Sequence, residues 1–281
     1  MIKILISILA MAMSHDALGK HDVYNQVIVL AGDKHKYSSF EPHLAPYLAE
    51  KSVPLFYGMN VNPNQGDHYV DRQKVLDLMA QNFDKEQKIL VLGWSISAKL
   101  IVYLLEEYPN IDRVIMMDPM DGSPPLSRNS EKRPFTTELE LPRTDFKTLI
   151  IKAENSHLSY SLLFPICDQP KQNYLLYMDQ YEDTDLFVKV IKQAGHLDLI
   201  YGPFGIGARI ACRSTKLPKA IALWMVKRTI EKFMNDQDIH SEFADCDMGL
   251  HGEKLADGSY CLDGEIKGEE FLQGVNNLDG Q

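Results

Sequence analysis

The sequence has no excess of positive charge and no apolar run of membrane-spanning length. Its 281 residues carry 29 Lys and Arg against 39 Asp and Glu, a formal net charge of −10. Nucleic-acid partners need clustered Lys and Arg to contact phosphates, so this balance argues against such a partner. The apolar run at residues 4–13 is far shorter than the roughly 20 residues of a membrane-spanning helix. We therefore expect no nucleic-acid partner and no membrane span, and the sequence leaves the oligomeric state open.

The start of the chain has the pattern of an export signal. Lys3 provides a positive charge, residues 4–13 are apolar, and residues 17–19 are small enough for cleavage. Hydrophobic residues make up 45% of the chain, which is ordinary for a soluble globular domain. We therefore expect a signal peptide over residues 1–19, one domain over 20–240, a polar tail over 241–281, and a secreted protein.

Cysteine is scarce, with four residues in the whole chain: Cys167, Cys212, Cys246 and Cys261. An even number in an exported protein favours two disulfides, and four cysteines allow three pairings. The preferred pairing joins Cys246 to Cys261, which bracket the polar tail, and Cys167 to Cys212. None of the four has the spacing of zinc ligands. We expect neither a metal nor an organic cofactor.

Short apolar runs alternate with amphipathic segments along the chain. The expected strands cover residues 27–30, 53–57, 88–92, 112–117, 148–151 and 186–191. The expected helices cover residues 41–51, 71–83 and 98–107, with a long final helix from Pro218 to about residue 234. This alternation predicts an α/β fold with a mostly parallel sheet and helices on both faces. Ligand sites of such sheets lie at the carboxyl ends of the strands.

The strongest chemical signal is Gly93-Trp94-Ser95-Ile96-Ser97, between an apolar strand and a helix. A nucleophile elbow has this context, because a tight turn there lifts the serine hydroxyl above the sheet. The elbow pattern usually ends in glycine, and here a small serine takes that place. Ser95 is therefore the candidate nucleophile.

A serine needs an adjacent base, and hydrolases of this kind order their triad as Ser, acid, His along the chain. His196 follows the last expected strand and is the candidate base. Asp118 ends the strand after the elbow helix and is the preferred acid, with Glu154, one strand later, as the alternative. Ser156 stands where polyester- and cutin-cleaving hydrolases carry their aspartate, which favours Asp118.

Backbone N–H groups must also stabilise the developing alkoxide. One is expected from Ile96, directly after the nucleophile. The other is expected from the turn after the first strand, at Asp33 or its neighbour Gly32. An aspartate at that turn is electrostatically unfavourable if its side chain faces the oxyanion.

Read together, these segments resemble the chlorophyllase family of α/β-hydrolases. The resemblance covers residues 26 to 235 and rests on the segments 93–98, 118–122, 164–167, 195–198 and 210–213. It implies cleavage of a carboxylic ester, in that family the phytyl ester of chlorophyll. It assigns nucleophile, acid and base to Ser95, Asp118 and His196, and it supports the pairing of Cys167 with Cys212.

The sequence departs from that family at three places. Gly-His-Ser-Arg-Gly-Gly is replaced by the residues from Gly93 to Ala98, the His-Gly oxyanion start by Ala31-Gly32, and the leading antiparallel strands are absent from the pattern. We expect a small apolar ester as substrate, since Trp94 and Ile96 flank the nucleophile. The alternative is a protein of the same fold without turnover, which binds a pigment or lipid or serves as an extracellular matrix component.

Overall fold

The structure is a computed structural model that describes residues 23–32, 34–50, 52–60, 66–121, 130–156, 172–202, 204 and 217–237. The expected signal peptide, the polar tail and all four cysteines lie outside the described residues. No helix in the described part is long and apolar enough to cross a bilayer.

Six strands form one sheet in which every pairing is parallel. They are β1 (Gln26–Gly32), β2 (Leu55–Met59), β3 (Ile89–Trp94), β4 (Ile111–Met117), β5 (Lys147–Ala153) and β6 (Asp185–Ile191). Their spatial order is β2-β1-β3-β4-β5-β6. Within the described ranges no antiparallel strand precedes β1. The expected α/β class and parallel sheet are confirmed.

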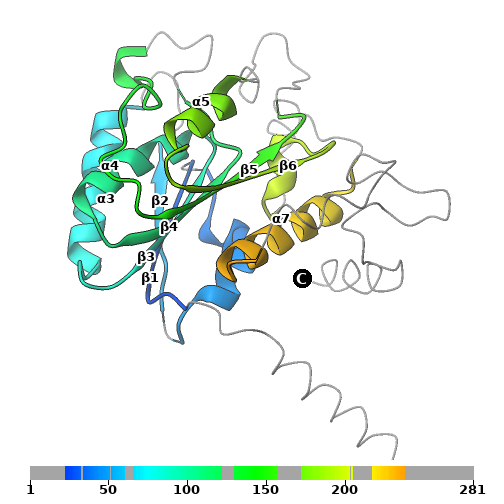
Figure 1. Cartoon of the computed structure of the whole chain (residues 1–281), viewed down its shortest axis with the longest axis horizontal. Helices are drawn as coiled ribbons and strands as arrows, with labels where there is room; N and C mark the ends of the chain where they lie inside the picture. Colours follow the sequence, from blue (N-terminus) through cyan, green and yellow to red (C-terminus); the bar gives the residue numbers. More distant parts are fainter. Residues whose placement is uncertain are drawn as a thin grey trace, which may run out of the picture.

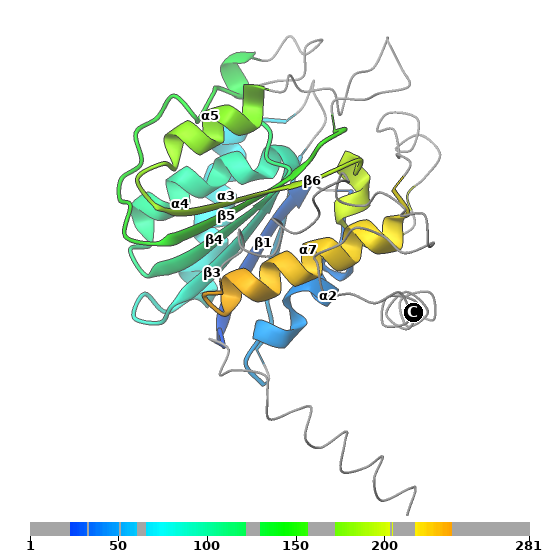
Figure 2. The same cartoon turned by 45° about the vertical axis from the view of Figure 1, so that its right-hand side comes forward.

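Helices cover both faces of this sheet (Figures 1 and 2). The helices are α2 (Glu41–Leu44), α3 (His68–Asn82), α4 (Ile101–Glu107), α5 (Gln172–Gln180) and α7 (Lys219–Met234), with the short 3-10 helices η1 (Tyr37–Ser39), η2 (Ala45–Tyr47), η3 (Ser95–Leu100), η4 (Ser130–Lys132) and η5 (His196–Leu199). In Figure 2 α2 and α7 lie on one side of the sheet, and α3, α4 and α5 lie on the other.

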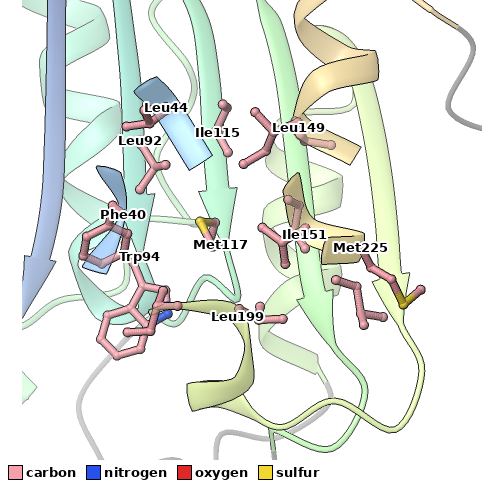
Figure 3. Packing of buried hydrophobic residues seen from close by; sticks show 14 of the residues in the cluster. Phe40, Leu44, Leu92, Trp94, Ile115, Met117, Leu149, Ile151, Leu199 and Met225 are labelled. Atoms are coloured by element: carbon pink, nitrogen blue, oxygen red, sulfur yellow. The ribbon is translucent and has the colours of Figure 1, made fainter. Parts of the chain in front are cut away.

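The core is divided by the sheet into two apolar clusters. On β3, Leu90 and Leu92 belong to the cluster under α2 and α7, whereas Ile89 and Val91 belong to the cluster under α3 and α4. Alternate side chains of a strand point to opposite faces, and a strand covered on both faces is apolar throughout. This is why each central strand contains a run of four or so consecutive apolar residues in the sequence, such as residues 89–92 and 114–117. Figure 3 shows the first cluster, with Leu92, Ile115 and Leu149 projecting from three neighbouring strands.

The helix expected over residues 41–51 is wrong in length. The α-helix α2 ends at Leu44, and the chain continues as the 3-10 turn η2 before the backbone becomes extended at Leu48. Pro46 explains the interruption, since proline has no N–H to donate to an earlier carbonyl of the helix and its ring crowds that carbonyl. The other expected helices of the described part are present, and α5 is an addition.

The chain order places the chemistry at one edge of the sheet. After β1 the chain moves outward to β2, crosses back through α3, and then adds β3 to β6 on the other side of β1. The carboxyl ends of all parallel strands meet at one edge, and the reversal of order opens a crevice there. The segments after β3, β4, β5 and β6 carry Ser95, Asp118, Glu154 and His196. With the nucleophile elbow after β3, this is the α/β-hydrolase fold.

Candidate active site

Ser95 lies at a sharp turn between β3 and η3. Its φ is 57°, in the left-handed region that residues other than glycine rarely adopt. Such strain in a strand-to-helix turn is the mark of a nucleophile elbow. A Cβ on Gly93 would lie 2.8 Å from Ala98 Cα and 2.8 Å from Ile101 Cδ1, so only glycine fits there. Ser97, where the usual pattern has a second glycine, is buried, and its Oγ has no hydrogen-bond partner among the described residues.

The hydroxyl of Ser95 is held by a methionine in this structure. Ser95 Oγ donates a hydrogen bond to Met120 Sδ over 3.1 Å, and Met120 N donates to Ser95 O over 3.2 Å. Met120 is in turn fixed by Tyr177, whose hydroxyl donates to the Met120 carbonyl over 3.1 Å. The serine is only 7% exposed. Transfer of its proton to a base therefore requires the hydroxyl to rotate away from the sulfur.

Asp118 and His196 are brought together across the sheet edge. Asp118 Oδ2 lies 2.5 Å from His196 Nδ1, and both side chains are buried. Asp118 follows β4 with a φ of 45°, a conformation that aspartate tolerates better than most residues. Because Nδ1 faces the carboxylate, Nε2 is the nitrogen of His196 left to act on a substrate or on Ser95. A buried aspartate on Nδ1 fixes the tautomer of the ring and stabilises its charged form.

A third charged side chain joins this pair. Lys152, next to the end of β5, places Nζ 2.6 Å from Asp118 Oδ1 and also donates to Ser156 Oγ. Ala153 N donates to the same Asp118 oxygen over 3.2 Å. Burial raises the pKa of the Asp118 carboxyl, but the charge of Lys152 and the hydrogen bond to His196 together hold it below its ordinary value. Asp118 is therefore an ionised carboxylate with both oxygens occupied.

The imidazole of His196 packs against an aromatic ring from the elbow. Trp94 stacks on it with ring centroids 4.5 Å apart and an interplanar angle of 27°. Trp94 also makes edge contacts with the rings of His35, at a centroid distance of 4.4 Å, and Phe40, at 6.2 Å. The indole is 4% exposed. Trp94 thus orients the candidate base and belongs to the site rather than only to the core.

Glu154, the alternative acid, faces another set of partners. Its Oε1 lies 3.2 Å from Lys192 Nζ, and its Oε2 accepts from Gln193 N over 2.9 Å. Its side chain is 34% exposed. His196 has its carboxylate contact with Asp118, so the geometry favours Asp118 as the acid.

Of the two expected donors of the oxyanion hole, Ile96 lies within the described residues and Asp33 does not. Ile96 is the second residue of η3, and N–H groups in the first turn of a helix have no acceptor within that helix. Its amide is therefore available to an oxyanion beside Ser95. Gly32 ends β1, and its carbonyl accepts from His35 N over 3.0 Å. Asp33 lies outside the described residues.

A second buried ion pair connects the elbow helix to the segment after β4. Lys99 Nζ lies 3.1 Å from Asp121 Oδ1, and both side chains are fully buried. Asp121 Oδ2 also accepts from the backbone of Thr136 over 2.8 Å and of Thr137 over 2.7 Å. Lys99 is four residues after Ser95 and Asp121 three residues after Asp118. The pair therefore connects the segments that carry the candidate nucleophile and the candidate acid.

Sequence reasoning missed Lys152, Met120 and the pair of Lys99 with Asp121. A signal for two of them was present. Lys152 is a charged residue at the end of an apolar strand, and Lys99 stands in a helix whose other residues are mostly apolar. Charged residues at such positions are almost never fully buried unless they are paired. The described residues contain no cluster of three or more His, Cys, Asp and Glu side chains suited to a metal ion.

No known protein family and no curated protein sequence matches the chain. Among solved structures, ferulic-acid-bound Est1E from Butyrivibrio proteoclasticus is 10% identical with a TM-score of 0.49, covering 78% of this chain and 91% of its own. A sugar hydrolase from Lactococcus lactis is 17% identical with a TM-score of 0.46, covering 76% and 89%. Mouse alpha/beta hydrolase domain-containing protein 10 is 14% identical with a TM-score of 0.42, covering 62% and 82%. Because the identities are below 25% and the TM-scores below 0.5, these structures assign no residue role and no activity to this chain.

Proposed function

We propose that this chain is a secreted serine hydrolase that cleaves a carboxylic ester of an apolar substrate. The observation that carries the proposal is the buried hydrogen bond between Asp118 and His196, at the edge of the sheet where Ser95 occupies a strained elbow. Nucleophile, base and acid come from the ends of three strands in the order that such hydrolases use. Orientation of a base by a buried carboxylate is the arrangement that activates a serine.

In the proposed mechanism Ser95 Oγ attacks the carbonyl carbon of the ester while His196 Nε2 takes its proton. Asp118 stabilises the imidazolium, and the N–H of Ile96 donates to the oxyanion. Collapse of the tetrahedral intermediate expels the alcohol, to which His196 returns the proton. Water then repeats the sequence on the acyl-enzyme and releases the acid.

The finer assignment rests on sequence features. A chlorophyllase-like ester substrate is supported by the motif resemblance and by the apolar residues Trp94 and Ile96 around the nucleophile. Secretion is supported by Lys3, the apolar run at residues 4–13 and the small residues 17–19. In an oxidising compartment the disulfides Cys167–Cys212 and Cys246–Cys261 would form.

A second candidate function has one observation in its favour. The hydroxyl of Ser95 donates to Met120 Sδ, and a thioether is a weak acceptor that does not activate a serine. A protein of this fold that has lost turnover, and binds a pigment or lipid or serves in an extracellular matrix, would keep such a resting contact. The two candidates differ in whether Ser95 reacts.

Reaction with a fluorophosphonate probe tests the proposal, because such probes phosphonylate only activated serines. We expect covalent labelling of the wild-type protein and none of Ser95→Ala, read by the mass of the intact protein. Ser97→Ala is the matched control in the same turn. It removes a buried hydroxyl that no described residue hydrogen-bonds, and it should label at the wild-type rate.

Failure of the folded wild type to label would contradict the proposal and favour the binding protein. If the wild-type protein is labelled, its rates of hydrolysis of short-chain, long-chain and phytyl esters are measured next. Preference for the long apolar esters is expected, and preference for short polar esters would contradict the chlorophyllase-like substrate.

A further inference from the structure

The carboxylate of Asp118 lies between two other buried side chains, those of Lys152 and His196. The carboxylate of Asp118 is shared, with Oδ1 toward Lys152 at 2.6 Å and Oδ2 toward His196 at 2.5 Å. The side chain of Lys152 is 10% exposed, and those of Asp118 and His196 are 0% and 4% exposed. Water therefore screens these charges little, and they interact more strongly than surface charges at the same distances.

The carboxylate of a serine triad helps catalysis by stabilising the imidazolium that forms when the histidine takes the serine proton. A lysine on the other carboxylate oxygen opposes this effect, because its fixed positive charge disfavours a second positive charge nearby. The unprotonated ring, which is the form that acts as base, is favoured instead. The lysine also holds the carboxylate ionised and in place, as does the amide of Ala153.

We propose that Lys152 is a positioning residue that lowers the pH at which His196 becomes available as a base. It does so because the carboxylate of Asp118 interacts with the ammonium of Lys152 as well as with the ring of His196, so that Asp118 stabilises the protonated ring less. The expected effect on the rate rests on the proposed function, because it requires His196 to act as a base. The expected effect on the protonation of His196 does not require catalysis. It extends the active site by one residue on β5, with Ser156 holding the ammonium from the far side.

Other titratable groups lie on the segments near the site, and they are the same in every variant at Lys152. By element they are His35 before η1, His43 of α2, Lys99 of η3 with Asp121 after β4, Glu154 after β5, Lys189 of β6, Lys192 after β6, Asp198 of η5, and Lys219, Lys227, Arg228, Glu231 and Lys232 of α7. Burial lowers the pKa of His43 to about 4, and its Nε2 lies 3.0 Å from the carbonyl of Leu199, so it is neutral near neutral pH. Asp198 accepts from Gly195 N over 2.7 Å. A comparison of variants at Lys152 cancels the contributions of these groups.

The kinetic test is the pH dependence of kcat/KM, or of the rate of probe labelling, which reports ionisations of the free enzyme. In Lys152→Met we expect the acid limb of the profile to move to higher pH by about one unit. The reason is that Asp118 then acts on His196 alone and the ring keeps its proton to higher pH. Lys152→Gln serves as a second uncharged variant if the methionine variant does not fold. Lys152→Arg keeps the charge and should keep the wild-type limb.

Lys147 supplies a matched control from the same strand. It begins β5 and pairs with Asp236 at 2.7 Å, and its side chain is 34% exposed. Lys147→Met should leave the limb unchanged. A purely structural role of Lys152 would lower the rate at every pH, whereas the proposed role lets the rate recover at high pH. An unshifted limb in a folded Lys152→Met or Lys152→Gln protein overturns the inference.

A direct titration separates this inference from the proposed function. NMR of histidine-labelled Ser95→Ala protein follows the ring of His196 with pH and needs no turnover, with assignment by His196→Gln. We expect a higher titration midpoint when Lys152→Met is added. If the wild type fails to label but this midpoint moves, the proposed function fails and the inference stands. If the wild type labels but the midpoint does not move, the inference fails alone.

Discussion

Asp118→Asn is expected to lower kcat by about four orders of magnitude, the size of loss seen when a triad aspartate becomes an amide. The amide cannot stabilise the imidazolium, and it favours the wrong ring tautomer. Asp118 Oδ2 is 2.5 Å from His196 Nδ1, so no water or second carboxylate lies between them. The change also leaves Lys152 without its counterion, and kcat must therefore be expressed per folded protein.

The matched control is Glu154→Gln, at the alternative acid. Glu154 contacts Lys192 and Gln193, and a pair whose side chains are 36% and 34% exposed contributes little. Its kcat on the same ester should stay close to that of the wild type. Hydrolysis of a chromogenic ester at saturating concentration measures both variants, with near-UV circular dichroism as the check of folding. A large loss in Glu154→Gln and a small one in Asp118→Asn would assign the acid to Glu154 and refute the site described above.

The largest effect on stability is expected from Asp121→Ala. The change leaves the ammonium of Lys99 fully buried without its carboxylate, and removing one partner of a buried ion pair costs about 3–5 kcal/mol. The donors of Thr136 and Thr137 also lose their acceptor. Burial lowers the pKa of Lys99, an effect that Asp121 opposes, so loss of the carboxylate favours release of its proton. Urea unfolding followed by circular dichroism gives the free energy of unfolding.

A surface ion pair provides the comparison. Arg143 and Asp145 lie 2.6 Å apart, but the side chain of Asp145 is 79% exposed. Asp145→Ala should therefore lower the free energy of unfolding by about 1 kcal/mol or less. Replacing both buried partners, with Lys99→Met and Asp121→Leu, should recover part of the loss, because two apolar side chains leave no unpaired charge. If the two alanine variants were equally stable, Lys99 and Asp121 would not connect the elbow to β4.

The sheet and the elbow could be predicted because their signals are local. Each central strand contains a run of consecutive apolar residues, since both of its faces are covered. The helix over residues 41–51 was predicted too long because the prediction took no account of Pro46. Proline inside a helical pattern removes a hydrogen bond whatever the spacing of its neighbours.

The candidate residues of the site could be predicted from the sequence, but the contacts that Lys152 and Met120 make with them could not. Asp118 and Glu154 each follow a strand, so strand order does not distinguish them, and only Ser156 and the motif resemblance favoured Asp118 in the sequence. The contact depends on the left-handed backbone at Asp118, which places its side chain over the neighbouring strand. Lys152 was missed because its partner is 34 residues away along the chain. Ion pairs at such separations leave no periodic pattern.

The stacking of Trp94 on His196 gives the protein an optical signal of its own. Indole emission is quenched by a protonated imidazole in contact with the ring, and much less by a neutral one. The chain has two tryptophans, and the other, Trp224, lies on α7 and packs against the apolar cluster between that helix and the sheet. In a Trp224→Phe protein the emission of Trp94 would therefore follow the charges of the two imidazoles in contact with it, His196 and His35, in solution and without substrate or label.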